Sequence, residues 1–151
     1  MRNTLAILLF AATLACQPEK KNNTSSDGSA TAQAPLNIQL QCESISENEE
    51  DPMYSVYAIV DDNKAKVAEI AVCDQIPVDS YNQYQIPEKA LTAVGGWWAG
   101  YGSYIYATRS SESTISIFLA EAGTSADESG MTTKKIATFA NGNFVFEDGV
   151  Q

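Results

Sequence analysis

The side chains best suited to binding a ligand are concentrated in one glycine-rich segment, residues 95–106. This segment holds both tryptophans of the chain, three of its seven tyrosines and four of its nine glycines. Aromatic rings offer a large apolar face and, in tryptophan and tyrosine, a polar edge, so an exposed group of them can stack on a sugar ring or anchor a protein partner. The candidate binding surface consists of Trp97, Trp98, Tyr101 and Tyr104, bordered by Arg109.

The same aromatic segment also has a purely structural interpretation. Neighbouring residues of an extended strand point to opposite faces, so we expect one of Trp97 and Trp98 to enter the core and the other to face solvent. In the structural alternative these aromatics fill the end of a barrel or the corner of a sandwich, and the glycines make room for them. Exposure of Trp97, Trp98 and Tyr101 would favour a binding surface, and burial of both tryptophans the structural role.

Residue types that support catalysis are largely missing. The chain has no histidine, which excludes histidine-based triads, histidine ligands for zinc and the side chain best suited to proton transfer near neutral pH. A nucleophile elbow, a P-loop and a dinucleotide-binding fingerprint are also absent from the sequence. We therefore predict that the chain is not an enzyme and takes no cofactor.

Acidic side chains outnumber basic ones in the chain by 19 to 9. The run at residues 43–51 offers oxygen ligands of the kind that calcium prefers. It lacks the spacing of a calcium-binding loop, and a solvated loop between two strands explains it as well, so we predict no metal site. Residues 36–151 carry 17 acidic and 6 basic side chains, a net charge of about −11. A nucleic-acid partner requires a basic surface and is therefore excluded.

Alternation of apolar and polar residues predicts β-strands. Residues 36–42 alternate without a break, as in a half-buried strand. The pair Asn141-Gly142 adopts the positive φ angles of a tight hairpin turn at low cost, so we expect a hairpin there. About seven short strands with local connections predict an all-β fold, either an antiparallel β-sandwich or a small β-barrel. Strands are expected at 36–42, 54–60, 64–73, 103–109, 114–120, 134–140 and 143–147, with a weaker strand signal at 90–94. A helical turn or two is the alternative at 88–94 and at 118–123.

The first sixteen residues have the pattern of an export signal. An apolar run at 5–14 follows Arg2; it is too short to cross a bilayer, which takes about 20 apolar residues, but suits a secretory signal peptide. Thr13-Leu14-Ala15-Cys16 supplies the cleavage site. The segment resembles the lipobox of bacterial lipoproteins, although that family usually has Leu, Val or Ile where Thr13 stands. An ordinary cleavage site, leaving a soluble protein with a free Cys16, is the alternative.

The resemblance to lipoproteins implies a signal peptide over 1–15 and acylation of Cys16, with palmitate as a typical lipid, which would anchor the protein to a membrane of the cell envelope. Gln17, in place of the Asp that retains such proteins at the inner membrane, implies the outer membrane. Residues 16–35 contain no aromatic residue and predict a flexible polar tether, followed by a single domain at 36–151. Because this acidic domain would be repelled by anionic lipid headgroups, we expect the lipid on Cys16 alone to hold the protein at the membrane.

Two cysteines remain after Cys16 is assigned to the lipid. Cys42 and Cys73 form an even pair, and disulfides persist outside the cytoplasm, so we predict a disulfide between them. Two buried free thiols are the alternative.

These observations leave two explanations of function. The first is a non-enzymatic binding module, held at the membrane and acting on an envelope protein, a glycan or a secreted enzyme. The second is a structural component of the envelope. In size, leader and strand pattern the chain is also similar to the small lipoprotein inhibitors of lysozyme, which are disulfide-bonded β-barrels, but their Ser-Gly-x-x-Tyr loop is absent here.

Overall fold

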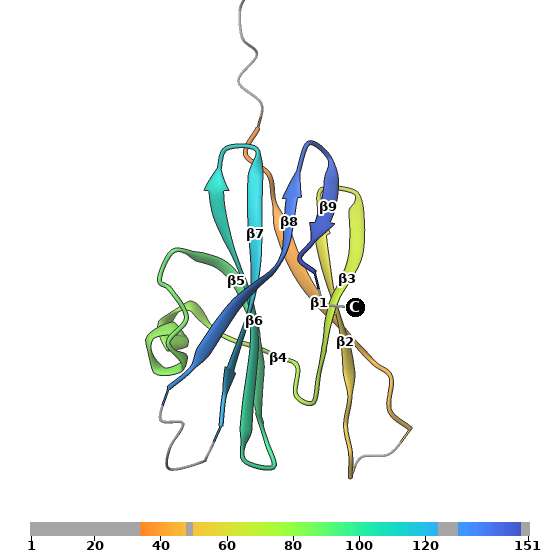
Figure 1. The fold of residues 1–151 in the computed structure, drawn as a ribbon, viewed down its shortest axis with the longest axis vertical. Helices are drawn as coiled ribbons and strands as arrows, with labels where there is room; N and C mark the ends of the chain where they lie inside the picture. The colour runs from red at the N-terminus through yellow and green to blue at the C-terminus, as the bar shows by residue number, and fades with distance from the viewer. Residues whose placement is uncertain (1–33, 48–49, 124–129, 149–151) are drawn as a thin grey trace, which may run out of the picture. The chain divides into compact units, whose positions relative to one another are not determined.

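The structure is a computed structural model that describes residues 34–47, 50–123 and 130–148. All of these residues belong to one compact unit, Gln33–Gln151, which contains two antiparallel sheets (Figure 1). The expected signal peptide, Cys16 and nearly all of the tether lie outside the described residues. Within the described ranges, no helix combines the length and apolar character needed to cross a membrane.

Each sheet is built from consecutive strands joined by local connections. The three-stranded sheet has the order β1-β2-β3, and the six-stranded sheet runs from β4 to β9 in chain order. Neither sheet closes on itself, so the fold is a sandwich-like pair of sheets and not a barrel. The strands are β1 (Ile38–Ser44), β2 (Tyr54–Val60), β3 (Asn63–Ile70), β4 (Asp74–Gln75), β5 (Ala90–Trp98), β6 (Tyr101–Ser111), β7 (Thr114–Ala122), β8 (Thr132–Ala140) and β9 (Asn143–Phe146).

The main hydrophobic core lies between the two sheets. Strand β2 alternates as its sequence predicts, and Val56, Ala58 and Val60 are fully buried. They belong to the same buried cluster as Ile105 and the other inward-facing residues of β6, β7 and β8. Burial of such side chains contributes about 1.5–3 kcal/mol each relative to leaving them exposed, which accounts for the pairing of the sheets.

A second core covers the outer face of the six-stranded sheet. Tyr104 and Tyr106 alternate with Ile105 along β6 and pack against the segment between β4 and β5. That segment contains the short 3₁₀ helix η1 (Val78–Tyr84). The tripeptides Gln75-Ile76-Pro77 and Gln85-Ile86-Pro87 stand on either side of η1, and their isoleucines are 5% and 3% exposed. Each isoleucine therefore fixes one end of the η1 segment to the sheet.

The disulfide prediction is confirmed. Cys42 of β1 is bonded to Cys73, with 6.1 Å between the Cα atoms. Cys73 follows β3 and immediately precedes Asp74, the first residue of β4. The bond therefore joins the three-stranded sheet to the edge of the six-stranded sheet. In the chain-entropy account, closing a loop of about 30 residues stabilises a fold by roughly 3–4 kcal/mol.

The all-β prediction is confirmed, but the expected helical turns are misplaced. Residues 88–94 and 118–123 lie mainly in β5 and β7, where pairing with neighbouring strands outweighs any local helical preference. The helix that does form, η1, carries no strong sequence signal: its first residue follows Pro77, and Gln85 ends it with a φ of 53°. Its position depends on burial of Tyr81 against the sheet, a tertiary contact.

Candidate binding site at the β5–β6 hairpin

The hairpin of β5 and β6 ends in a two-residue turn. Ala99 and Gly100 have φ angles of 48° and 89°, which is the sign that a tight hairpin turn requires at both positions. Across the hairpin, Trp97 pairs with Gly102 and Trp98 with Tyr101. We call Trp97, Trp98 and Tyr101 the aromatic tip.

All three residues of the aromatic tip are exposed. Trp97 is 49% exposed, Trp98 39% and Tyr101 69%. The expectation that one tryptophan enters the core is therefore wrong, although the two do lie on opposite faces of the hairpin, as strand geometry requires. Trp97 shares its face with Gly102, because a Cβ atom on Gly102 would lie 3.0 Å from Cε2 of the indole.

The reason that neither tryptophan enters the core is the length of the neighbouring strands. Strand β4 pairs with β5 only at Val94 and Gly95. On the other side, the pairing of β7 with β6 begins at Gly102. The end of the β5–β6 hairpin therefore extends beyond both β4 and β7. Among the described residues, no further strand flanks this end of the hairpin.

Tyr104 does not belong to the exposed surface predicted for it. It is fully buried, and its ring centroid lies 5.1 Å from that of Tyr84. Its hydroxyl has no hydrogen-bond partner in the described part of the chain. Burial, with a smaller effect from Tyr84, raises the pKa of Tyr104 to about 12. Tyr104 therefore supports the hairpin from within the second core.

Arg109 also has a structural position and does not border the aromatic tip. It lies eight residues beyond Tyr101 on β6, which is about 26 Å at 3.3 Å per residue. Its Nη2 donates a 2.7 Å hydrogen bond to the carbonyl oxygen of Leu36. Arg109 thus holds the start of the described chain against the far end of the six-stranded sheet.

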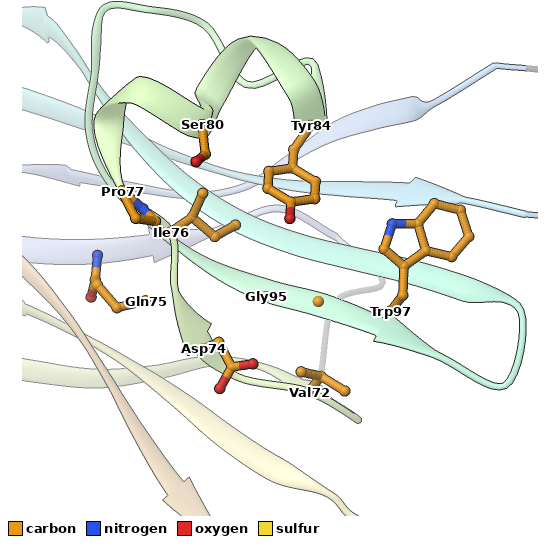
Figure 2. A pocket seen from close by; sticks show the side chains of 10 residues that line it. Val72, Asp74, Gln75, Ile76, Pro77, Ser80, Tyr84, Gly95 and Trp97 are labelled. Atoms are coloured by element: carbon orange, nitrogen blue, oxygen red, sulfur yellow. The ribbon is translucent and has the colours of Figure 1, made fainter.

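A groove adjoins the Trp97 side of the aromatic tip. It has a volume of about 340 Å³ and lies between the end of β5, β4 and η1 (Figure 2). Trp97 and Tyr84 supply its aromatic groups, and Asp74 and Ser80 add a carboxylate and a hydroxyl. Figure 2 shows the Tyr84 hydroxyl directed into the groove, with the nitrogen edge of Trp97 turned towards it.

The backbone of β5 forms part of the groove because glycine is required there. Gly95 has a φ of 149°, and a Cβ atom on it would collide with the carbonyl oxygen of Ser103. At the next position, a Cβ atom on Gly96 would collide with the side chain of Val72. These glycines allow β5, Tyr104 and the β3–β4 connection to approach one another closely.

The sequence alone did not reveal Asp74, Ser80 and Tyr84 as groove residues. They lie 13 to 23 residues before Trp97, in a segment with no strong strand or helix pattern. The only available signal was the repeated Gln-Ile-Pro, whose two copies stand on either side of η1. That repeat indicates where the segment is attached, but not which of its polar residues face Trp97.

The described part of the acidic run forms no cluster of candidate metal ligands. Among the residues described, no three or more His, Cys, Asp or Glu side chains gather as a metal site would require. Glu43 instead forms an ion pair with Lys64, whose Nζ lies 2.6 Å from Oε1 of the carboxylate. Comparison of the chain with protein-family models, curated proteins and solved structures gave no match.

Proposed function

We propose that the chain is a non-enzymatic binding module of the cell envelope, anchored to a membrane through lipid on Cys16, with the outer membrane favoured, and contacting its partner through the aromatic tip. The single observation that carries the binding role is the exposure of Trp97, Trp98 and Tyr101 together at the end of one hairpin. Tryptophan and tyrosine contribute most to binding when they are buried by a partner. A purely structural role would bury both tryptophans, and neither is buried.

The position of the aromatic tip within the domain supports this proposal. The bond from Arg109 places Leu36 near the β6–β7 turn, whereas the tip lies at the opposite end of β6 (Figure 1). An anchor attached to residues before Leu36 would join the domain at the end opposite the tip. The tip therefore does not coincide with the point at which the tether joins the domain.

The charge of the domain limits the partner. Of its few basic side chains, Lys64, Lys66, Lys134 and Lys135 each lie within 4 Å of a glutamate, so they offer little free positive charge. With a net charge of about −11 on residues 36–151, the domain repels anionic molecules over roughly a Debye length. A neutral or basic envelope protein or an uncharged glycan fits this surface.

Affinity capture from envelope extract tests the proposal. The native protein is compared with a Trp97→Ala/Trp98→Ala variant and with Val145→Ala, a control that trims an exposed apolar side chain on β9. We expect the double variant to lose a species that the native protein and the control both retain. Equal capture by all three proteins, or no specific capture by any, would contradict the proposal.

A further inference from the structure

We propose that the groove beside the aromatic tip binds a short uncharged saccharide. This inference rests on the proposed binding role and assigns a ligand class to one side of the hairpin. It follows from three properties of the groove: its aromatic groups, its free polar atoms and the absence of positive charge from its lining.

The aromatic groups of the groove pack against Gly102 and Tyr104 of β6. Trp97 lies across the hairpin over Gly102, and Tyr104 lies within 3.1 Å of the same Cβ position. Tyr84 in turn packs on the buried ring of Tyr104. Rings that are already positioned lose little conformational entropy when a ligand covers them. They offer an apolar surface to the C–H groups of a sugar ring.

The polar atoms of the groove supply both donors and acceptors. The Asp74 carboxylate accepts hydrogen bonds, the Trp97 indole N–H donates, and the hydroxyls of Ser80 and Tyr84 do both. In the described ranges, no other protein group forms a hydrogen bond with any of these side chains. Gln75, by contrast, is occupied, because its Nε2 donates to the carbonyl oxygen of Ala93 at 2.9 Å.

The charge of the groove selects among ligand classes. No lysine or arginine lines the groove, and Asp74 is its one charged residue. Phosphates and acidic sugars are therefore disfavoured. An ammonium group would fit Asp74 and the rings, but it has no acceptor for the Trp97 N–H. Sugar hydroxyls donate and accept, so an uncharged saccharide uses every free group.

The volume also suits a small ligand. At about 340 Å³, the groove lies near the lower end of ligand pockets, which span about 300–1,000 Å³. It therefore suits a short saccharide, with further rings extending along the open edge of β5 beyond Gly95.

The two tryptophans make a direct test possible. The chain contains no others, so native protein labelled with 5-fluorotryptophan gives two fluorine signals, which a Trp98→Phe variant assigns. Chitotriose, maltotriose and mannotriose are the neutral probes; tri-galacturonic acid and tetramethylammonium are the anionic and cationic probes. We expect at least one neutral trisaccharide to shift the Trp97 signal more than the Trp98 signal, and the charged probes to bind more weakly.

Two conservative variants locate the ligand in the groove. Tyr84→Phe keeps the ring on Tyr104 and removes one hydroxyl, so we expect binding to weaken about 3- to 10-fold. Asp74→Asn removes a charged acceptor and is expected to weaken binding about 10-fold or more. Val145→Ala is the matched control, with unchanged affinity.

Three results would overturn the inference. The first is no shift of the Trp97 signal by any neutral probe up to about 10 mM, a range that covers a weak dissociation constant near about 1 mM. The second is tighter binding of a charged probe, and the third is saccharide binding that neither Tyr84→Phe nor Asp74→Asn weakens. None of them decides the capture experiment. There, loss of the partner in a Trp98→Ala/Tyr101→Ala variant would still support the aromatic tip, since neither residue lines the groove.

Discussion

The β5–β6 and β8–β9 hairpins have the same kind of turn but use their aromatic residues differently. In β8–β9, Asn141 and Gly142 have φ angles of 52° and 77°, and in β5–β6 both turn residues are likewise positive. Beside the β8–β9 turn, Phe139 is 2% exposed, and its ring centroid lies 4.9 Å from that of Phe144. Beside the β5–β6 turn, Trp98 and Tyr101 are exposed. One hairpin therefore closes the core, and the other extends beyond it.

The two turns also differ in how readily their residues adopt a positive φ angle. Asparagine and glycine adopt positive φ readily, whereas alanine in the left-handed region costs roughly 1–2 kcal/mol. Four non-glycine residues of the described chain have positive φ, and Ala99 is the only one without a polar side chain. Local sequence thus explains the β8–β9 turn, while pairing of the flanking strands must impose the β5–β6 turn. Strain of this kind is often found at functional sites.

The largest expected difference between the hairpins is in stability. Phe139→Ala removes a fully packed ring and is expected to lower the free energy of unfolding by about 3–5 kcal/mol. Trp98→Ala removes a side chain that is already 39% exposed, so we expect a loss of about 1–2 kcal/mol. Urea denaturation, with equal m-values, measures both. A larger loss for Trp98→Ala than for Phe139→Ala would show that the tip belongs to the core.

The second prediction concerns alkaline pH, because the tyrosines beneath the tip are buried. The pKa of Tyr104 is raised from 10 to about 12, so the unfolded chain ionises first as the pH rises. The contribution of neutral Tyr104 to the free energy of unfolding is fully present below pH 10. It is lost between pH 10 and 12, and the loss amounts to about 2–3 kcal/mol. Burial also raises the pKa of Tyr81 and Tyr106, which adds to the loss.

Denaturation at several pH values checks this behaviour in Tyr104→Phe, with Tyr101→Phe as a control at the exposed tip. We expect Tyr104→Phe to reduce the alkaline loss. At pH 7 it should be neutral or slightly stabilising, because the hydroxyl it removes has no hydrogen-bond partner in the described chain. A loss of more than about 1 kcal/mol at pH 7 would mean that this hydroxyl is hydrogen-bonded.

The smallest expected effects come from exchanging the turn residues. Ala99→Gly relieves the left-handed strain and is expected to raise the free energy of unfolding by about 1 kcal/mol. Asn141→Ala introduces the same strain into the other hairpin and is expected to lower it by about 1 kcal/mol. Thermal unfolding of the two variants side by side is sufficient. Destabilisation by Ala99→Gly would indicate that Ala99 is not strained.

The comparison also shows what the sequence can predict. Alternation located most strands, Asn141-Gly142 located its turn, and the even pair of cysteines located the disulfide, because each is a local or simple combinatorial signal. Alternation also placed Trp97 and Trp98 on opposite faces. It did not show that β4 and β7 end before them, and that is why both are exposed.

The remaining errors arise from long-range packing. Tyr104 was expected beside the tryptophans at the surface, but η1 and its flanking isoleucines cover that face of β6. Arg109 was placed at the same surface, although it lies at the far end of the strand, bonded to Leu36. The groove joins Asp74 and Tyr84 to Trp97 only after β4 pairs with β5. The lipid on Cys16 stays a prediction.

The most direct test of the aromatic tip uses its two tryptophans as the only fluorine-labelled groups of the native protein in unlabelled envelope extract. If the tip contacts a partner, the signal of Trp98 as well as that of Trp97 should shift or broaden as extract is added, and Val145→Ala should behave alike. If both signals stay unchanged across the titration, the aromatic tip is not the surface by which this protein binds.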